Sequence, residues 1–571
     1  MVYTINMENI KKEILKIINK KYKKEILDIS DFSYPPNEKM GDLSLPCFKL
    51  AKELKTNPAE LAALLVKELA NKFNNIDSLV ALGPYLNFFI DKQSLFENIY
   101  KNILKNNNTF ANNKVGKDKR VMIEFSNLNT HKEVHVGHLR NIFFGDSVSR
   151  ILSANGYNVF PVSYINDFGI HTAKTLWAYN EFYKRTLIPA NRGEFLGKIY
   201  IRASKELEKN ELGKQMVSFI MKKIESREGP EYELWKETRE WSIEQLENIY
   251  KELNINIKHV FYENEFIDKG IAQVKEMLVQ GILKESEGAT IADLSEYNLG
   301  VMVFLRSDGT ALYPVADIPL ARFKIEKYKL DESIYVVDNR QKLNFKQLFK
   351  VLELMGYKQK FVHLDYDSVK LPGGAMSSRD GNTVTYDEFK EEALAKTIKE
   401  TKNKHVDWPE YKIKEVSKKI VFGAMKFEML KVGTDQIITF DMDEALRFDG
   451  YTSAYLQYTY ARIASILRKA DNFSHKIVDF SLLVNEKEKS LILKVSKYSE
   501  IIKKAGQDYN PSEIAKYLFE LSQLLNDYYH SINILKGEEK YINPRLSLVY
   551  GVQQILKNGL SFLGIEVMEE M

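Results

Sequence analysis

The chain has little of what a disulfide-rich, metal-clustered or membrane-spanning protein needs. It contains one cysteine, Cys47, which excludes an internal disulfide framework and a zinc site built from several cysteines. No apolar run approaches the roughly 20 residues that a membrane-spanning helix requires. The formal net charge of +4 is small for 571 residues, so any nucleic-acid-binding face must be a local one. These absences favour a reducing compartment, and we expect no membrane partner.

Arginine is also missing from the first 119 residues, since Arg120 is the first in the chain. The same region contains Glu8, Glu13 and Glu25. An arginine-rich, acid-poor transit peptide is therefore not expected, and the predicted location is the cytoplasm. The length predicts two to four domains, with the 44% hydrophobic and 28% charged residues of an ordinary globular protein.

The stretch 121–141 is predicted to be a strand, a polar turn and the start of a helix. Val121 to Phe125 forms a short apolar run, and apolar residues recur at helical spacing after residue 138. Gly137 would let a ligand approach the backbone closely, and the unpaired N–H groups of a helix N-terminus suit the phosphates of a nucleotide. Alternatively, His131 and His135, one turn apart, are surface residues or a metal pair. Three of the nine histidines lie here: His131, His135 and His138.

Further apolar runs predict a parallel sheet. A run at residues 159–164 ends in the polar segment 165–169, and ligands bind at such strand ends in open α/β sheets. Residues from about 181 to 295 are charged and mostly helical in pattern, so they are predicted to form a helical insertion. Strand signals resume at Val301 to Leu305, Ile334 to Val337 and Phe361 to Leu364. Five strands alternating with helices indicate a Rossmann-like fold.

Two later segments carry candidate ligand-binding groups. Asp317 precedes a helical run, where it is either a functional carboxylate or only a helix cap, and Gln347 lies in the next predicted helix. Glycines flank a loop whose hydroxyls and arginine suit an anionic ligand. The loop residues are Met376, Ser377, Ser378 and Arg379.

The two ends of the chain are predicted to be separate domains. Residues 7–20 have the pattern of an amphipathic helix, and Asn57 begins a second, well-capped one. The last third is helical. One face of its helix near residue 460 combines aromatic and basic side chains, which suits unstacked RNA bases, or the tyrosines simply pack on a neighbouring helix. That face carries Tyr451, Tyr455, Tyr458 and Arg462.

The segment His135-Val136-Gly137-His138 resembles the HIGH element of class I aminoacyl-tRNA synthetases. The wider stretch EFSNLNTHKEVHVGHLRN is similar to the form of this element in the arginyl-tRNA synthetases. The loop AMSSR resembles their KMSKS loop, with Ala375 and Ser378 in place of its two lysines. The N-terminal GDLS segment and the run GYTSAYLQYTYARIASILRK are similar to the flanking domains of that family.

The resemblance implies three domains. They are an α+β N-terminal appended domain (1–112), an α/β Rossmann-like class I catalytic domain (113–448) with the helical insertion, and an all-α C-terminal anticodon-binding domain (449–571). The implied activity is ATP- and Mg2+-dependent ligation of L-arginine to tRNA(Arg) through an arginyl-adenylate, with activation that requires tRNA. We expect a monomer.

The resemblance also implies roles for individual residues. Lys132 and Arg379 are the competing cations that could replace the missing loop lysines. ATP would meet His135, Gly137, His138, Met376, Ser377 and Ser378. Arginine would meet Glu124, Asn127, Asn129, Tyr313, Asp317, Gln347 and, on weaker similarity, Glu263. The tRNA would meet Tyr451, Tyr455, Tyr458 and Arg462.

Two other functions compete with this interpretation. A metal hydrolase built on His131 and His135 would need a third ligand and bound zinc. A tRNA-binding relative without activity would need a ruined active site, whereas HVGH, Asp317 and Gln347 are all present.

Overall fold

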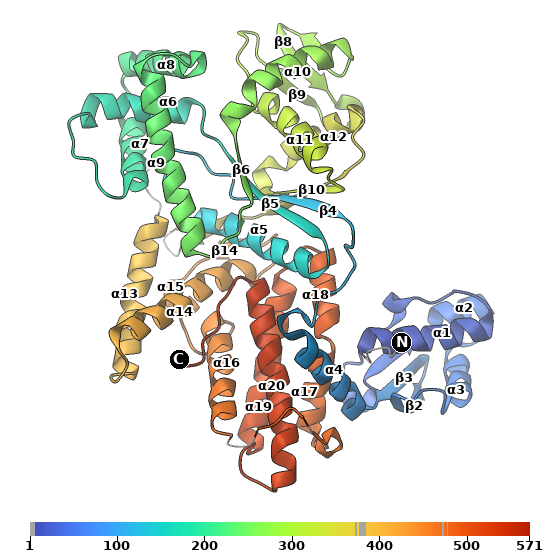
Figure 1. Cartoon of the computed structure of the whole chain (residues 1–571). Coiled ribbons are helices and arrows are strands. Elements are labelled where there is room, and N and C mark those ends of the chain that lie inside the picture. The colour runs from blue at the N-terminus through green and yellow to red at the C-terminus, as the bar shows by residue number, and fades with distance from the viewer. Residues whose placement is uncertain (1–5, 372–373, 376–383, 471–472, 477) are drawn as a thin grey trace.

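A five-stranded parallel sheet lies at the centre of the molecule (Figure 1). The structure is a computed structural model that describes residues 6–371, 374–375, 384–470, 473–476 and 478–571. The sheet order is β11-β10-β4-β5-β6, and every neighbouring pair is parallel. The inner strands are buried on both faces, which explains their continuous apolar sequences. The strands are β4 (Arg120–Glu124), β5 (Asn158–Ile165), β6 (His259–Tyr262), β10 (Glu332–Asp338) and β11 (Lys360–Tyr366).

One predicted strand of this sheet is wrong. Val301–Leu305 is β9, which pairs antiparallel in a separate sheet with β8 (Ala289–Asp293), itself paired with β7 (Lys284–Ser286). The fifth parallel strand is β6, which lies inside the region predicted to be a helical insertion. Its four residues are too short an apolar run to stand out between charged helices. β9 exposes alternate residues, as antiparallel strands do, although its sequence is apolar throughout.

Helix α5 (Val136–Ala154) connects β4 to β5 and is buried along most of its length. It packs against the sheet on one side and α14 (Glu410–Leu430) on the other. A Cβ atom at Gly145 would lie 2.2 Å from Cγ of Phe125, so the glycine allows the close approach of helix and strand. At the far end of α5, the Asn155 amide donates to the carbonyl oxygen of Ile502 at 3.0 Å.

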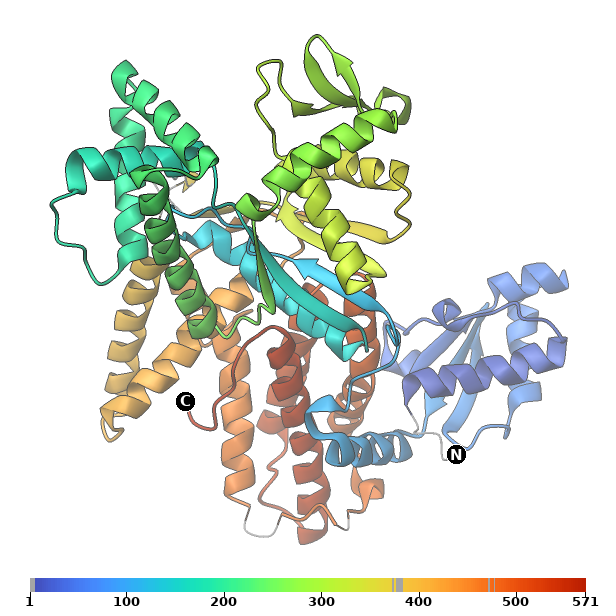
Figure 2. The ribbon, with the colours of Figure 1, turned by 45° about the horizontal axis from the view of Figure 1, so that its top comes forward.

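Two lobes stand on one side of the sheet, as Figures 1 and 2 both show. The first is helical, with a core around Trp177, Trp235 and Trp241. It consists of α6 (Ile170–Ala178), α7 (Arg192–Glu206), α8 (Glu211–Ser226) and α9 (Pro230–Glu252). The second contains β7, β8 and β9 with α10 (Ile267–Val279), α11 (Pro314–Tyr328) and α12 (Lys342–Leu354).

The helical C-terminal region shares one apolar core with the sheet and α5. In α16 (Ser453–Arg468), Leu456, Tyr460 and Ile463 are buried in this core and Leu467 is partly buried against it. The other helices are α13 (Tyr386–Lys404), α15 (Met442–Ala445), α17 (Glu486–Ser496), α18 (Tyr498–Gln507), α19 (Ser512–Ser531) and α20 (Glu539–Phe562). The short strands β12 (Val369–Leu371), β13 (Gly374–Ala375) and β14 (Ile438–Thr439) form a small sheet.

The N-terminal region has its own apolar core and a three-stranded antiparallel sheet. As predicted, the Asn57 side chain caps α3 by accepting from the backbone N–H groups of Ala59 and Glu60. Glu500 of α18 accepts hydrogen bonds from the Lys11 ammonium at 2.8 Å and from the Tyr34 hydroxyl at 2.7 Å. These contacts hold the N-terminal region against the helical one. The elements of the N-terminal region are α1 (Met7–Tyr22), β1 (Leu43–Pro46), α2 (Phe48–Leu54), α3 (Pro58–Leu69), β2 (Ile76–Leu82) and β3 (Tyr85–Ile90). Helix α4 (Lys92–Asn106) follows and buries Phe96, Tyr100 and Ile103 in the main core, so it connects the two regions. Within the described ranges, no helix combines the length and apolar character needed to cross a membrane.

Candidate active site

The N-terminus of α5 carries a stacked pair of histidines. His135 is the residue before the helix, and its backbone N–H donates to Nδ1 of His138 at 3.2 Å. The two rings stack with their centroids 3.6 Å apart. Nδ1 of His135 is buried and has no hydrogen-bond partner within the described parts of the chain. A polar ring atom left unpaired beside free helix N–H groups suits an anionic ligand.

Burial keeps both rings of this pair neutral. Together with the nearby Lys132 ammonium, it lowers the pKa of His135 to about 4 and holds the pKa of His138 well below its usual range. The Lys132 ammonium also lies 5.0 Å from the ring centroid of Tyr200. The structure therefore brings His135, His138 and Lys132 together, with Gly137 between the histidines in the sequence.

His131 is not a surface residue, and both of its ring nitrogens face threonine hydroxyls of the protein. Its side chain is fully buried, Nδ1 lies 2.9 Å from Oγ1 of Thr130, and Nε2 lies 2.8 Å from Oγ1 of Thr238. The imidazole thus attaches the turn to α9. Among the residues that the structure describes, no group of three or more His, Cys, Asp or Glu side chains could hold a metal ion. The metal-hydrolase alternative therefore loses its pair of ligands.

The carboxyl ends of three neighbouring strands supply the other side of the site. Glu124 is the last residue of β4, Asn166 follows β5 and Glu263 follows β6. Because parallel strands end at one edge of the sheet, these groups lie near one another. Nδ2 of Asn166 donates to Oε2 of Glu263 at 3.2 Å, and Nδ2 of Asn127 donates to Oε1 of Glu124 at the same distance.

Helix α11 adds an acid and a base to this edge. Burial and the nearby Glu124 carboxylate raise the pKa of Asp317 to about 7, although the Lys324 ammonium opposes that change. Lys324 forms a buried ion pair with Glu124. Burial, together with Asp317 and Asp167, raises the pKa of Glu263 to about 8. The site is therefore short of positive charge, which suits a cationic ligand.

Tyr313 lies at the mouth of this carboxylate cluster. The residue is 71% exposed. Partial burial raises the pKa of its hydroxyl, and the nearby Glu263 and Asp317 carboxylates raise it further. Tyr164 lies deeper, where burial and the surrounding carboxylates raise its pKa. Of the residues predicted to hold the amino acid, the structure brings together Glu124, Asn127, Tyr313, Asp317 and Glu263.

Other predicted residues make different contacts or fall outside the description. The side-chain amide of Gln347 donates to the carbonyl oxygens of Leu299 at 2.7 Å and Val301 at 3.3 Å, so here it ties α12 to the segment that leads into β9. Asn129 forms a backbone bridge with Asn166. Met376, Ser377, Ser378 and Arg379 lie outside the described residues.

Two charged partners at this edge were not predicted from the sequence. Lys324 follows Asp317 by seven residues, a spacing that puts both on one helix face, and this signal was available. The second is Arg239, whose Nε lies 2.6 Å from Oδ2 of the fully buried Asp167. It comes from α9, which is distant in sequence, so spacing alone could not reveal it.

The comparisons with known proteins decide the family. Residues 99–441 match the family model described as tRNA synthetases class I (R), catalytic domain, which covers more than half of the chain. The chain belongs to the arginyl-tRNA synthetases. Residues 8–90 match the arginyl tRNA synthetase N terminal domain, and residues 456–571 match the DALR anticodon binding domain.

Relatives support the same family over nearly the whole length. The chain is 36% identical to the arginine--tRNA ligase of Bdellovibrio bacteriovorus over 550 residues, covering 94% of this chain and 93% of that protein. It is also 36% identical to that of Halothermothrix orenii over 545 residues, covering 94% and 95%. The solved arginyl-tRNA synthetase of Thermus thermophilus superposes with a TM-score of 0.84 at 28% identity, covering 99% of this chain and all of that one. The predicted class I fold with N-terminal and helical C-terminal domains is confirmed.

The C-terminal domain of this arginyl-tRNA synthetase exposes a smaller aromatic surface than predicted. Tyr451 and Tyr455 are half-buried and pack against Phe519, with ring centroids 4.9 Å and 5.5 Å away, so the packing alternative is right for them. Tyr458 is 38% exposed, and the Arg462 guanidinium lies 4.8 Å from its ring centroid. Tyr529 of α19, which the sequence analysis missed, lies 5.5 Å from the same guanidinium.

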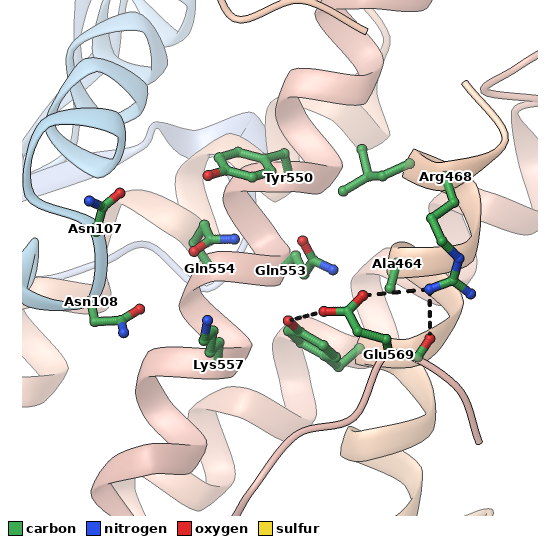
Figure 3. A pocket seen from close by; sticks show the side chains of 11 residues that line it. Asn107, Asn108, Ala464, Arg468, Tyr550, Gln553, Gln554, Lys557 and Glu569 are labelled. Carbon is green, nitrogen blue, oxygen red and sulfur yellow. Dashed lines mark hydrogen bonds and ion pairs between the residues drawn. The ribbon is translucent and has the colours of Figure 1, made fainter. Parts of the chain in front are cut away.

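A separate hollow of about 680 Å³ opens in the helical domain (Figure 3). It lies between α16, α20 and the residues that follow α4. Glu569 crosses it, accepting from the Tyr460 hydroxyl at 3.2 Å, while Arg468 donates to the Glu569 carbonyl oxygen at 3.0 Å. Its lining residues include none of those predicted to act in the synthetase reaction.

Proposed function

We propose that the chain joins L-arginine to tRNA(Arg) at the site between the α5 N-terminus and the carboxylate cluster. Its family makes it an ATP-dependent arginine–tRNA ligase. One observation supports the location best: a carboxylate cluster that includes the buried Glu124 and Glu263 lies on the same sheet edge as a helix N-terminus with two neutral histidines. The first suits a guanidinium and the second suits phosphates.

On the amino-acid side, Asp317 and Glu124 are the partners of the guanidinium. A planar cation leaving water needs charge-assisted hydrogen bonds, and carboxylates accept them in pairs. Glu263 is a further carboxylate at the rim, and Tyr313 covers the mouth. We also assign Asn127 and Asn129 to this pocket. Gln347 would reach the α-amino group only after leaving its two backbone carbonyls.

On the phosphate side, His135 and His138 donate N–H groups while Gly137 leaves space for the nucleotide. The arginine carboxylate attacks the α-phosphorus of ATP and pyrophosphate leaves, so negative charge develops on the leaving group. Lys132, next to the histidines, supplies the cation that Ser378 lacks, with Arg379 as its competitor. Mg2+ would accompany ATP through its phosphates, since the described carboxylates include no three-ligand group for it.

In the second step a terminal hydroxyl of the tRNA attacks the acyl carbonyl and AMP leaves. The exposed Tyr458 with Arg462 is the proposed stacking surface for unpaired tRNA bases. We propose that bound tRNA completes the pocket, so that arginine activation requires it by induced fit. The chain would act as a cytoplasmic monomer, with domains divided near residues 112 and 448.

Amino-acid-dependent pyrophosphate exchange tests this proposal. The purified chain is assayed with ATP, Mg2+ and each of the 20 amino acids, with and without a tRNA pool. We expect exchange with arginine alone and only when tRNA is present. Exchange with another amino acid would overturn the substrate, and strong exchange with arginine in the absence of tRNA would overturn the tRNA requirement.

A further inference from the structure

The cation buried in the amino-acid pocket has no assigned role. The Lys324 side chain is 1% exposed, and its ammonium is paired with the Glu124 carboxylate, whose side chain is 5% exposed. Aromatic rings enclose the ammonium, with centroids 5.1 Å away for Phe261, 5.5 Å for Tyr335 and 5.9 Å for Tyr164. Placing a lysine here is costly unless its charge is used, because a buried ammonium loses its hydration.

The balance of charges in the pocket indicates how the charge of the Lys324 ammonium is used. Without Lys324, the buried Glu124 and the half-buried Asp317 would be two neighbouring carboxylates, and such a pair tends to keep one proton at neutral pH. With Lys324, one positive charge is already present. An entering guanidinium then makes two cations for two carboxylates, so both acids can be ionised in the complex. Neutral carboxyl groups would instead donate a hydrogen bond where the guanidinium also donates.

We propose that Lys324 is a positioning residue for arginine selection, which holds the Glu124 carboxylate in place beside a compensating positive charge so that Glu124 and Asp317 can receive one guanidinium together. This inference rests on the proposed amino-acid site. Lys324 acts through Glu124 and does not touch the substrate in this arrangement. Asn127 holds the other oxygen of the same carboxylate at 3.2 Å, so Glu124 is oriented from both sides.

The position of Lys324 on its helix supports the assignment. Lys324 and Asp317 lie seven residues apart on α11. One rigid helix therefore fixes the distance between the Asp317 carboxylate, which would bind arginine, and the Lys324 ammonium. The groups that share this electrostatic environment come from five elements. They are Glu124 on β4, Tyr164 on β5, Glu263 after β6, Asp317 on α11 and Tyr335 on β10.

The distinguishing measurement is the pH dependence of KM for arginine in the Lys324→Met variant. Removing the ammonium makes Glu124 and Asp317 harder to ionise together, so tight arginine binding should need a higher pH. In tRNA aminoacylation we expect KM for arginine to rise at least tenfold at pH 7 and by threefold or less at pH 9, with KM for ATP within twofold of the parent. Lys324→Arg, which keeps the charge, should keep the parental pH profile.

Lys327→Met is the matched control, since Lys327 is exposed on the same helix and should leave every constant unchanged. A parental pH profile in Lys324→Met, or the same shift in Lys324→Arg, would overturn the inference and leave the lysine a purely structural role. If Lys324→Met does not fold, Glu124→Gln/Lys324→Met replaces the ion pair with a neutral pair. That variant should fold and use arginine poorly at every pH, and parental use of arginine would refute the inference.

One further variant separates this inference from the proposed site. If Glu124→Gln alone leaves KM for arginine unchanged, the proposed amino-acid pocket is wrong. If Glu124→Gln raises KM for arginine while Lys324→Met does not, the proposed pocket is supported and only the role proposed for Lys324 is refuted.

Discussion

The two sides of the candidate active site manage charge in opposite ways. On the phosphate side, His135 and His138 are neutral donors whose pKa values lie far below 7, and the ionised group is Lys132 next to them. On the amino-acid side, Asp317 and Glu263 have pKa values raised into the physiological range. One side therefore keeps its charge state through the neutral range, while the other changes with pH and with the ligand.

The two sides also differ in how the chain builds them. Lys132, His135 and His138 come from one turn and the first residues of one helix. The carboxylate cluster instead draws on β4, the ends of β5 and β6, and α11, which are up to 193 residues apart between Glu124 and Asp317. A local motif can be disturbed by one local change, whereas an assembled cluster depends on the whole sheet.

Loss of Asp317 should separate the two sides most clearly. In Asp317→Ala the guanidinium would lose a charged partner in a buried place, which costs on the order of 3 kcal/mol, or about a hundredfold or more in kcat/KM for arginine. KM for ATP should stay nearly unchanged, because the phosphate side is intact. Steady-state aminoacylation measures both, with the exposed Asp268→Ala as control. Parental constants for arginine would remove Asp317 from the site.

Loss of Lys132 should impair the phosphate side and leave the amino-acid side intact. In Lys132→Ala a preorganised cation would be missing as charge develops on pyrophosphate, which costs roughly 3 kcal/mol, about a hundredfold in the activation rate. KM for arginine should change little, and Ser378→Lys should restore part of the rate. The measurement is single-turnover activation with tRNA bound. A parental rate in Lys132→Ala combined with a slow Arg379→Ala would assign the charge to the loop arginine instead.

The two sides should also differ in the unmutated protein, in the pH dependence of KM for arginine and of KM for ATP. Asp317 and Glu263, with pKa values of about 7 and 8, must lose protons before they can pair with a guanidinium. KM for arginine should therefore fall by on the order of tenfold as the pH rises from 6 to 8.5, since one pKa unit corresponds to 1.36 kcal/mol. KM for ATP should stay flat over this range, because the histidines are already neutral. Glu263→Gln should remove the upper part of the change, and a flat arginine curve in the parent would contradict the assignment.

The smallest effect is expected outside both sides, at the helical domain. Tyr458→Ala removes one stacking ring and should raise KM for tRNA about fivefold, corresponding to ~1 kcal/mol. Arginine and ATP constants should not move. Tyr411→Ala, which removes another exposed tyrosine at the start of α14, is the control. Equal effects of the two variants would show that the Tyr458 stack is not a specific contact.

The local parts of this structure were predictable from the sequence and the assembled parts were not. The strand, turn and helix around His135 were predicted because apolar periodicity and turn residues act over a few positions. β6 was missed because four residues carry too weak a signal, and β9 was misassigned because an apolar run does not reveal its pairing partner. The spacing from Asp317 placed Lys324 on the same helix face, but its ion pair with Glu124 was not predictable because contact between β4 and α11 depends on tertiary packing. The resemblance to a family supplied Asp317, for which local sequence offered a helix cap equally well.

The clamp formed by Lys11, Tyr34 and Glu500 makes the N-terminal domain a part that can come loose without unfolding. Its apolar core is separate from the main one, and polar contacts such as this clamp tie it to α18. Glu500→Ala would remove the acceptor for both the ammonium and the hydroxyl, while each core stays packed. The N-terminal domain would then be held less firmly against α18. This change should weaken the binding of a long, rigid RNA substrate and leave the binding of free arginine and ATP unchanged.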